Sequence, residues 1–282
     1  MATKLGIIAG GGELPARLIE VCRAMGREVF VIAFEGQTEP ATVAGVAHAW
    51  IRLGRFGAAL EALKGEGVED LVLIGPIKRP RLGELGLDIR AARWLAKVGA
   101  ESLGDDGLLR AVISALEEEG FRVHGADDLL VDLLAPAGPL GVHRPDAGAE
   151  RDIARGLAVA KALGAADVGQ AVVVQQGIVL GVEAVEGTDR LLRRCAELGR
   201  EGPGGILVKI KKPGQERRVD LPTVGVLTVT GAARAGLRGI AVEAGGTLIV
   251  DRLAVVEAAD EAGLFVLGID VTAVTAAASG RN

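Results

Sequence analysis

Charged side chains are concentrated in one short segment of an otherwise apolar chain. The segment runs from Lys209 to Thr223. Its polar members are five cations, two carboxylates and one amide, namely Lys209, Lys211, Lys212, Arg217, Arg218, Glu216, Asp220 and Gln215. Cleavage of a pyrophosphate requires cations that offset the charge on the phosphoryl oxygens. It also requires carboxylates that hold Mg²⁺ or orient the attacking water. The segment supplies both kinds of group, although an ordinary charged loop in solvent has the same composition.

A glycine-rich turn near the start of the chain is a second candidate. Gly10, Gly11 and Gly12 follow an apolar run over Lys4–Ala9 and precede Pro15, which suits the first turn of a helix. Glycines let the backbone approach a phosphate, and the amino end of a helix adds partial positive charge. We therefore predict that Gly11 and Gly12 contact the ligand, with a simple tight turn as the alternative. Because Pro15 replaces the last glycine of the G-x-G-x-x-G fingerprint, NAD binding is disfavoured.

Two further segments combine turn residues with charge. Gly75–Pro80 follows an apolar run and holds two cations between prolines, so Gly75 and Arg79 are predicted anion contacts. A solvated charge pair is the alternative there. Asp106, in Gly104-Asp105-Asp106, is a predicted substrate contact, and capping of the following helix explains it equally well.

The segment Glu186–Asp189 reads as the start of a helix. With the arginines that follow, Thr188, Asp189 and Arg193 resemble a grip for phosphate or hydroxyl groups. The alternative is an ordinary helix whose N-cap is Thr188.

The elements that must position these residues alternate between strands and helices in the first half of the chain, as in an open parallel sheet. The predicted strands are Lys4–Ala9, Glu28–Phe34, Asp70–Ile74 and Phe121–His124, and the predicted helices are Pro15–Met25, Phe56–Lys64, Arg90–Val98 and Asp106–Glu119. Near-continuous apolar strands indicate a sheet covered on both faces. We predict an α/β fold with a Rossmann-like N-terminal domain, in which ligands bind at the carboxyl ends of the strands.

Two prolines and two glycines within Leu134–Gly141 predict a linker. It separates an N-terminal domain over 1–134 from a C-terminal α/β domain over 135–282 that carries the charged segment. The second half is predicted to contain helices over Ala149–Leu163 and Arg190–Glu197, and strands over Gln170–Gln175, Ile178–Val185 and Gly205–Lys211. Gln176-Gly177 is predicted as a hairpin turn.

Composition narrows the function classes. The 282 residues are 49% hydrophobic with a mean hydropathy of +0.35, yet no apolar run reaches the roughly 18 residues that span a bilayer. The N-terminus lacks the features of a signal peptide, so we expect a cytoplasmic protein. A net charge of −5 and 2% aromatic residues disfavour nucleic acid as a partner. Cys22 and Cys195 are expected to be reduced and buried, since neither belongs to a C-x-x-C pair.

Seven segments, taken in order, carry a resemblance that extends nearly end to end. They are Gly6–Pro15, Gly104–Asp106 with Leu108–Arg110, Asp167–Gln170, Glu183–Asp189 with Leu192–Arg194, Lys212-Pro213 with Gln215-Glu216, Arg218–Thr223, and Gly263–Gly268. Each is weak alone, but the ordered set resembles the UDP-2,3-diacylglucosamine pyrophosphatase family of the LpxI type.

This resemblance implies two α/β domains with a lipid-linked sugar nucleotide held between them, and Mg²⁺ as the cofactor. The implied reaction of lipid A biosynthesis releases UMP and 2,3-diacylglucosamine 1-phosphate after water attacks the phosphorus on the sugar side. Asp220 matches the essential aspartate of the family's R-V-D-L-P-T motif. We therefore predict Asp220 as a catalytic residue and metal ligand, assisted by Glu216. The predicted substrate contacts are Gly11, Gly12, Gly75, Arg79, Asp106, Gln170, Thr188, Asp189, Arg193, Lys211, Lys212 and Gln215.

The lipid substrate implies contact with the inner membrane. We expect this contact to be weak and peripheral, because no strongly basic amphipathic helix is evident. The apolar surplus of the composition also allows a homodimer. Two other classes stay open: a non-catalytic protein that binds lipids or nucleotide sugars, and a sugar-nucleotide oxidoreductase, against which Pro15 argues.

Overall fold

The computed structural model describes residues 3–78, 86–98, 105–212 and 221–274, without the side chains of residues 95–98, 105 and 106. The chain divides into two compact units, and the first boundary between them in the sequence lies between Val131 and Asp132. Each unit contains its own sheet and its own hydrophobic core. The prediction of an α/β protein with two domains is confirmed.

The first unit contains a five-stranded parallel sheet of order β3-β2-β1-β4-β5. Its strands are β1 Leu5–Ala9, β2 Val29–Phe34, β3 His48–Ile51, β4 Asp70–Ile74 and β5 Arg122–His124. The order in which successive strands are added to the sheet reverses between β1 and β4, whose carboxyl ends are followed by Gly10 and Gly75. Such a switch point is the usual ligand crevice of an open sheet.

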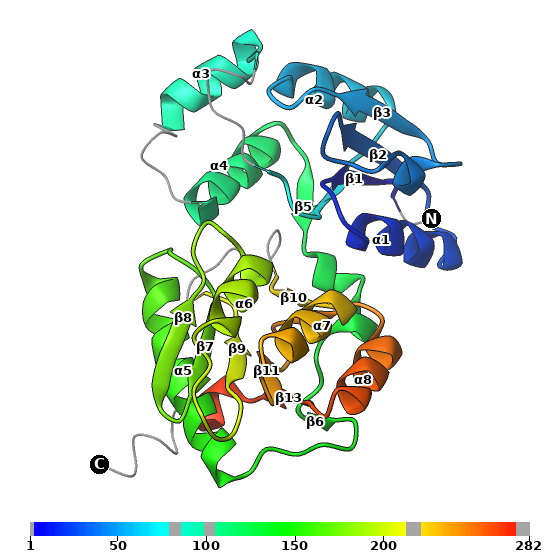
Figure 1. Cartoon of the computed structure of the whole chain (residues 1–282). Coiled ribbons are helices and arrows are strands. Elements are labelled where there is room, and N and C mark those ends of the chain that lie inside the picture. The colour runs from blue at the N-terminus through cyan, green and yellow to red at the C-terminus, as the bar shows by residue number, and fades with distance from the viewer. Residues whose placement is uncertain (1–2, 79–85, 99–104, 213–220, 275–282) are drawn as a thin grey trace. The chain divides into compact units, whose positions relative to one another are not determined.

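Four helices of the described residues belong to the first unit, namely α1 Leu14–Ala24, α2 Phe56–Gly65, α3 Ile89–Val98 and α4 Asp105–Glu118 (Figure 1). On one face of the sheet, Leu60 and Leu63 of α2 and Leu116 of α4 pack on buried strand residues. The alternate strand residues point to the other face, where Leu18 of α1 is fully buried. The predicted helices therefore agree with the structure to within one or two residues.

A six-stranded mixed sheet of order β6-β13-β11-β9-β7-β8 forms the centre of the second unit. Its strands are β6 Gly138–Leu140, β7 Ala171–Gln175, β8 Ile178–Val182, β9 Ile206–Lys209, β11 Gly239–Glu243 and β13 Phe265–Ile269, and β10 Thr223–Val224 pairs separately with β12 Leu248–Ile249. The central β9, β11 and β13 are parallel. The predicted Gln176-Gly177 hairpin joins the antiparallel β7 and β8.

The sequence predicted that Leu134–Gly141 is a linker. In the structure this segment also contains the strand β6. Gly138–Leu140 pairs antiparallel with β13 and forms the edge of the sheet. A proline is tolerated at this position because an edge strand has one side without ladder partners. The turn-forming composition therefore concealed a short strand of the second unit.

Helices cover both faces of the second sheet (Figure 1). Helix α5, Ala147–Ala165, packs on one face through Ile153 and Leu157. Three helices form the opposite layer, α6 Thr188–Ala196, α7 Val226–Arg234 and α8 Arg252–Glu261, with α6 beside α7 and α7 beside α8. Cys195 of α6 is buried in this layer and Cys22 in the first unit, so both cysteines are free and buried as predicted.

Candidate functional site

The carboxyl edge of the second sheet collects the polar residues that the sequence singled out. Strand β9 ends at Lys209 and the parallel β11 ends at Glu243. Because β7 runs antiparallel to β9, the residue before it, Gln170, lies at the same edge, and Ile210 N donates to the Gln170 carbonyl (3.1 Å). Glu183 follows β8 and pairs through its backbone N–H with Ala171 O (2.8 Å). Segments far apart in sequence thus meet at one edge.

Three lysines follow one another along this edge. Lys209 is buried, and its Nζ donates to the carbonyl of Thr223 (3.0 Å). Lys211 Nζ lies 3.2 Å from Glu243 Oε1, and its backbone N–H donates to the other oxygen of that carboxylate (3.1 Å).

The third lysine, Lys212, is the better shielded of the two that carry ion pairs. Its Nζ is 2.7 Å from Asp167 Oδ1, and its side chain is only 12% exposed. A charge held in a partly desolvated site interacts more strongly with a phosphate than one in open water. Lys212 is therefore the stronger candidate of the predicted pair, Lys211 and Lys212, for offsetting phosphoryl charge.

A buried carboxylate, Glu183, organises the neighbouring part of the edge. One of its oxygens accepts from Gln170 N (3.1 Å) and the other from Thr188 Oγ1 (2.5 Å). The side-chain oxygen of Gln170 is itself buried and has no hydrogen-bond partner among the described residues. A buried acceptor without a donor costs free energy, so this oxygen is suited to receive a donor from a ligand.

The alternative interpretation of Thr188, as the N-cap of this helix, is wrong, and its predicted role as a substrate contact stays a prediction. The N-cap of α6 is Gly187, whose φ of 78° lies in the region that favours glycine. No side chain therefore caps this helix start. Thr188 is instead the first residue of the helix, and its hydroxyl donates a hydrogen bond to the Glu183 carboxylate. Asp189 and Arg193 are exposed on α6.

Glu186 and Arg194 secure the loop that precedes α6. Arg194 donates to Glu186 Oε1 (2.7 Å) and to the Val182 carbonyl (2.9 Å). Hydrogen bonds from backbone amides, together with the Arg194 guanidinium, lower the pKa of Glu186 below its usual range. The carboxylate is therefore ionised at neutral pH, and the pair fixes the connection between β8 and α6.

Several predicted residues cannot be placed. Asp220, Glu216, Gln215 and Arg79 lie outside the described residues. Asp106 begins α4 together with Asp105, but its side chain is not described. Within the described ranges, no group of three acidic, histidine or cysteine side chains could hold a metal ion. The carboxylates of Asp167 and Glu243 are already paired with lysines, so these residues do not form a Mg²⁺ site by themselves.

The glycines of the first unit permit a close approach of two loops. A Cβ on Gly10 would lie 2.3 Å from the carbonyl oxygen of Gly75, and one on Gly75 would lie 2.5 Å from Gly11 O. The Gly11 N–H donates to Pro76 O (2.9 Å), and the Gly12 N–H donates to Glu39 Oε1 (3.2 Å). The glycines thus serve the packing of the switch point, and a ligand at Gly12 would compete with Glu39.

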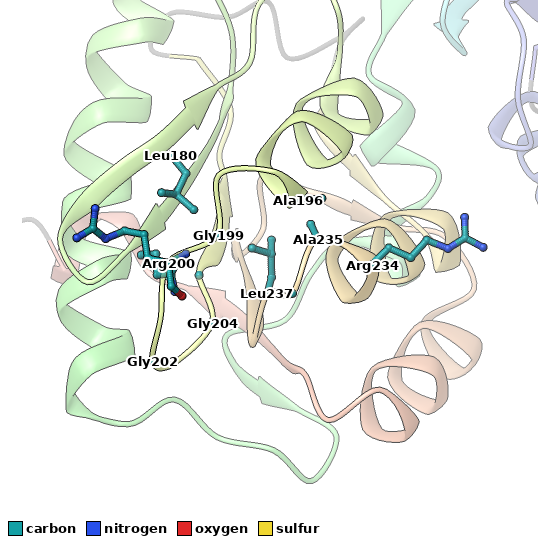
Figure 2. A pocket seen from close by; sticks show the side chains of 12 residues that line it. Leu180, Ala196, Gly199, Arg200, Gly202, Gly204, Arg234, Ala235 and Leu237 are labelled. Atoms are coloured by element: carbon teal, nitrogen blue, oxygen red, sulfur yellow. The ribbon is translucent and has the colours of Figure 1, made fainter.

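A hollow of about 290 Å³ lies in the second unit, but at the amino ends of β9 and β11. Figure 2 shows Arg200 and Arg234 at its rim with their guanidinium groups directed away from it. The side-chain amide of Gln175 donates hydrogen bonds to the carbonyls of Arg200 and Pro203 (2.8 and 2.9 Å). None of the predicted site residues lines this hollow, so we assign the site to the opposite, carboxyl edge.

Comparison with known proteins identifies the family. The model of the LpxI N-terminal domain matches residues 4–133, and that of the LpxI C-terminal domain matches residues 136–267. A curated relative from Caulobacter vibrioides, named UDP-2,3-diacylglucosamine pyrophosphatase LpxI, is 44% identical over 274 residues, which cover 95% of this chain and 98% of the relative. The chain belongs to the LpxI family. The resemblance predicted from the ordered segments is thereby confirmed.

Within this LpxI chain the structure adds residues that the sequence analysis did not assign. Glu183, Glu243 and Asp167 supply the carboxylates that hold Gln170, Lys211 and Lys212 in place. Glu183 and Asp167 lie inside two of the segments that carry the family resemblance, and this was the only indication of a functional role that the sequence analysis had for them. The lysine that pairs with Asp167 is 45 residues away in the sequence, so the role of Asp167 required the fold.

Proposed function

We propose that this LpxI chain hydrolyses the pyrophosphate bond of UDP-2,3-diacylglucosamine. The products are UMP and 2,3-diacylglucosamine 1-phosphate, in a step of lipid A biosynthesis. The observation that carries the proposal is the 44% identity, over nearly the full length of both chains, to a protein named for this activity. The lysine-rich carboxyl edge supports it, because cleavage places negative charge on phosphoryl oxygens that cations must offset.

In this proposal the described residues bind and orient the substrate. Lys212 and Lys211 face the pyrophosphate, and the unpaired Gln170 oxygen accepts a donor from the substrate. Asp220, assisted by Glu216, orients the attacking water. The proposal includes Mg²⁺ dependence, with Asp220 as the residue that would hold the cation. When bound, the cation would offset phosphoryl charge. The division into domains over 1–134 and 135–282 is kept as part of the same proposal.

The proposed location is the cytoplasmic side of the inner membrane, with peripheral contact. No helix in the described ranges is long and apolar enough to cross a bilayer. A substrate with two acyl chains resides in the lipid phase, so the enzyme must meet that phase to reach it.

The deciding experiment is incubation of the full chain with UDP-2,3-diacylglucosamine in ¹⁸O-labelled water, with Mg²⁺ or with EDTA. We expect UMP and the acylated sugar 1-phosphate to appear only with Mg²⁺, with the label in the sugar phosphate. Label in UMP would overturn the assigned site of attack. Product formation in EDTA would remove Mg²⁺ from the proposal, and absence of products from folded protein would reject the activity.

Replacement of Lys212 by methionine is expected to lower kcat/KM about 100-fold, because a well-shielded cation of the carboxyl edge is lost. Lys212→Arg should restore part of the rate, since it keeps the charge. Lys64→Met is the matched control, because it removes a similarly short pair, Lys64 Nζ to Glu119 Oε2 at 2.6 Å, from the first unit. Equal losses in both methionine variants would contradict a role for Lys212 in the reaction.

A further inference from the structure

Large apolar side chains are exposed at the same carboxyl edge of the second unit that carries the lysines. Val185, just before α6, is fully exposed. Leu227, the second residue of α7, is 79% exposed, and Leu253, the second residue of α8, is 84% exposed. An isolated exposed leucine is unremarkable, but several at one edge require an explanation.

Leu227 and Leu253 lie on α7 and α8, and Val185 lies in the connection that precedes α6; these three helices are neighbours. Helix α6 packs beside α7 and α7 beside α8, and all three cover the same face of the sheet (Figure 1). Each begins where the chain leaves the carboxyl edge, so their first turns lie at that edge. Val226 is also exposed there, and Val168 lies at the same edge, next to the Asp167 that pairs with Lys212. We call Val168, Val185, Val226, Leu227 and Leu253 the apolar row.

Most charges of the described residues beside the apolar row have a neighbour of opposite sign. The first turn of α6 carries Asp189 and Arg190, and α8 begins with Asp251 as its N-cap followed by Arg252. The two lysines at the same edge, Lys211 and Lys212, are paired with Glu243 and Asp167. These described residues therefore do not form the basic patch that anionic partners select. Its contact with a partner must therefore come mainly from burial of apolar surface.

We propose that the apolar row is the surface through which the second unit contacts the lipid bilayer. This inference rests on the proposed function, because a substrate with two acyl chains remains in the bilayer and presents only its polar head to water. The pyrophosphate of such a substrate lies at the headgroup level. A row of exposed apolar side chains beside Lys211 and Lys212 brings the lysines to that level when it enters the acyl boundary.

The test measures co-sedimentation of the full chain with phosphatidylcholine vesicles and with vesicles that also contain phosphatidylglycerol. We expect binding to both, with little change when salt is raised. Leu227→Glu and Leu253→Glu should each lower the partition about tenfold, in line with the loss of one buried leucine. Leu198→Glu is the matched control, because Leu198 is also exposed but lies just beyond the other end of α6.

Hydrolysis assays separate this proposal from the activity itself. In detergent micelles, where the substrate is already dispersed, the two row variants should keep the wild-type rate, and they should lose rate only on substrate in vesicles. A wild-type chain that hydrolyses micellar substrate but does not bind vesicles would overturn the bilayer proposal and leave the activity standing. Equal loss in micelles and vesicles, with vesicle binding unchanged, would also overturn it and assign the row to the acyl chains of bound substrate. Vesicle binding that depends on phosphatidylglycerol and is insensitive to the row variants would reject the row as the contact surface.

Discussion

Asp220→Asn is expected to lower turnover of UDP-2,3-diacylglucosamine by about three orders of magnitude while the protein remains folded. Asparagine has nearly the same shape as aspartate, but it can neither accept a proton from water nor balance the charge of a cation. The described residues on both sides of its segment are fixed at the carboxyl edge. Lys212 pairs with Asp167 before it, and after it the Thr223 carbonyl accepts from buried Lys209 and the Pro222 carbonyl accepts from Leu248 N (2.8 Å). The described residues that flank Asp220 on both sides therefore lie at the proposed site.

The measurement compares single-turnover rates of wild type, Asp220→Asn and Asp260→Asn. Asp260, near the end of α8, accepts a hydrogen bond from Val142 N (2.8 Å) and serves as a carboxylate remote from the carboxyl edge. Far-UV circular dichroism establishes that each variant is folded. Near-normal turnover in Asp220→Asn would remove Asp220 from the reaction, whereas a similar loss in Asp260→Asn would indicate a general sensitivity to lost carboxylates.

The sequence predicted the fully buried elements well because their pattern is unambiguous. Strands β1, β4 and β7 are buried at every position, and a continuous apolar run has few other interpretations. Strand β3 was missed because His48–Ile51 is short and alternates between exposed and half-buried positions at the edge of its sheet. Strand β6 was missed because a proline and a glycine in three residues indicate a turn.

The candidate site was less accessible to sequence reasoning. Local chemistry identified Lys211 and Lys212, because a cluster of cations is visible in the sequence itself. The partner of Lys212, however, lies 45 residues away, and that of Lys211 lies 32 residues away. Pairings at such separations follow from strand order, which no local pattern encodes. Thr188 shows a different limit, since its partner Glu183 is only five residues away but a hydroxyl at a helix start suggests a cap equally well.

The largest stability effect is expected at Asp70, a buried carboxylate at the start of β4. Its oxygens accept hydrogen bonds from Thr3, from Arg27 NH2 (2.7 Å) and from Arg122 Nε (2.8 Å), and His124 Nε2 lies 2.9 Å away. These partners belong to the chain segments around β1, β2 and β5. Asp70 therefore ties together the amino edge of the first sheet, far from its proposed ligand edge.

Asp70→Asn is expected to lower the free energy of unfolding of the first unit by about 3 kcal/mol, because it removes a buried anion from the well-shielded Arg27 and from the more exposed Arg122. Glu69→Gln is the matched control. Glu69 pairs with the same Arg122 at 3.0 Å, but both side chains are more than half exposed, so the expected loss is below about 0.5 kcal/mol. The chain's two tryptophans, Trp50 and Trp94, both lie in the first unit, so their fluorescence during urea unfolding reports this unit alone.

The pH dependence provides a second and independent check on Asp70. Burial raises the pKa of this carboxyl, but the hydrogen bonds from Thr3, His124 and Arg122 and the charge of Arg122 outweigh burial and hold the pKa well below its usual range. Because the folded-state pKa is depressed, the stabilisation is complete above the unfolded pKa of about 3.9 and is lost as the pH falls below it. The stability difference between wild type and Asp70→Asn should therefore still be present at about pH 5 and shrink in more acidic solution. A difference that does not shrink below about pH 4, or one no larger than that of Glu69→Gln at pH 7, would show that the ionised Asp70 does not hold this edge together.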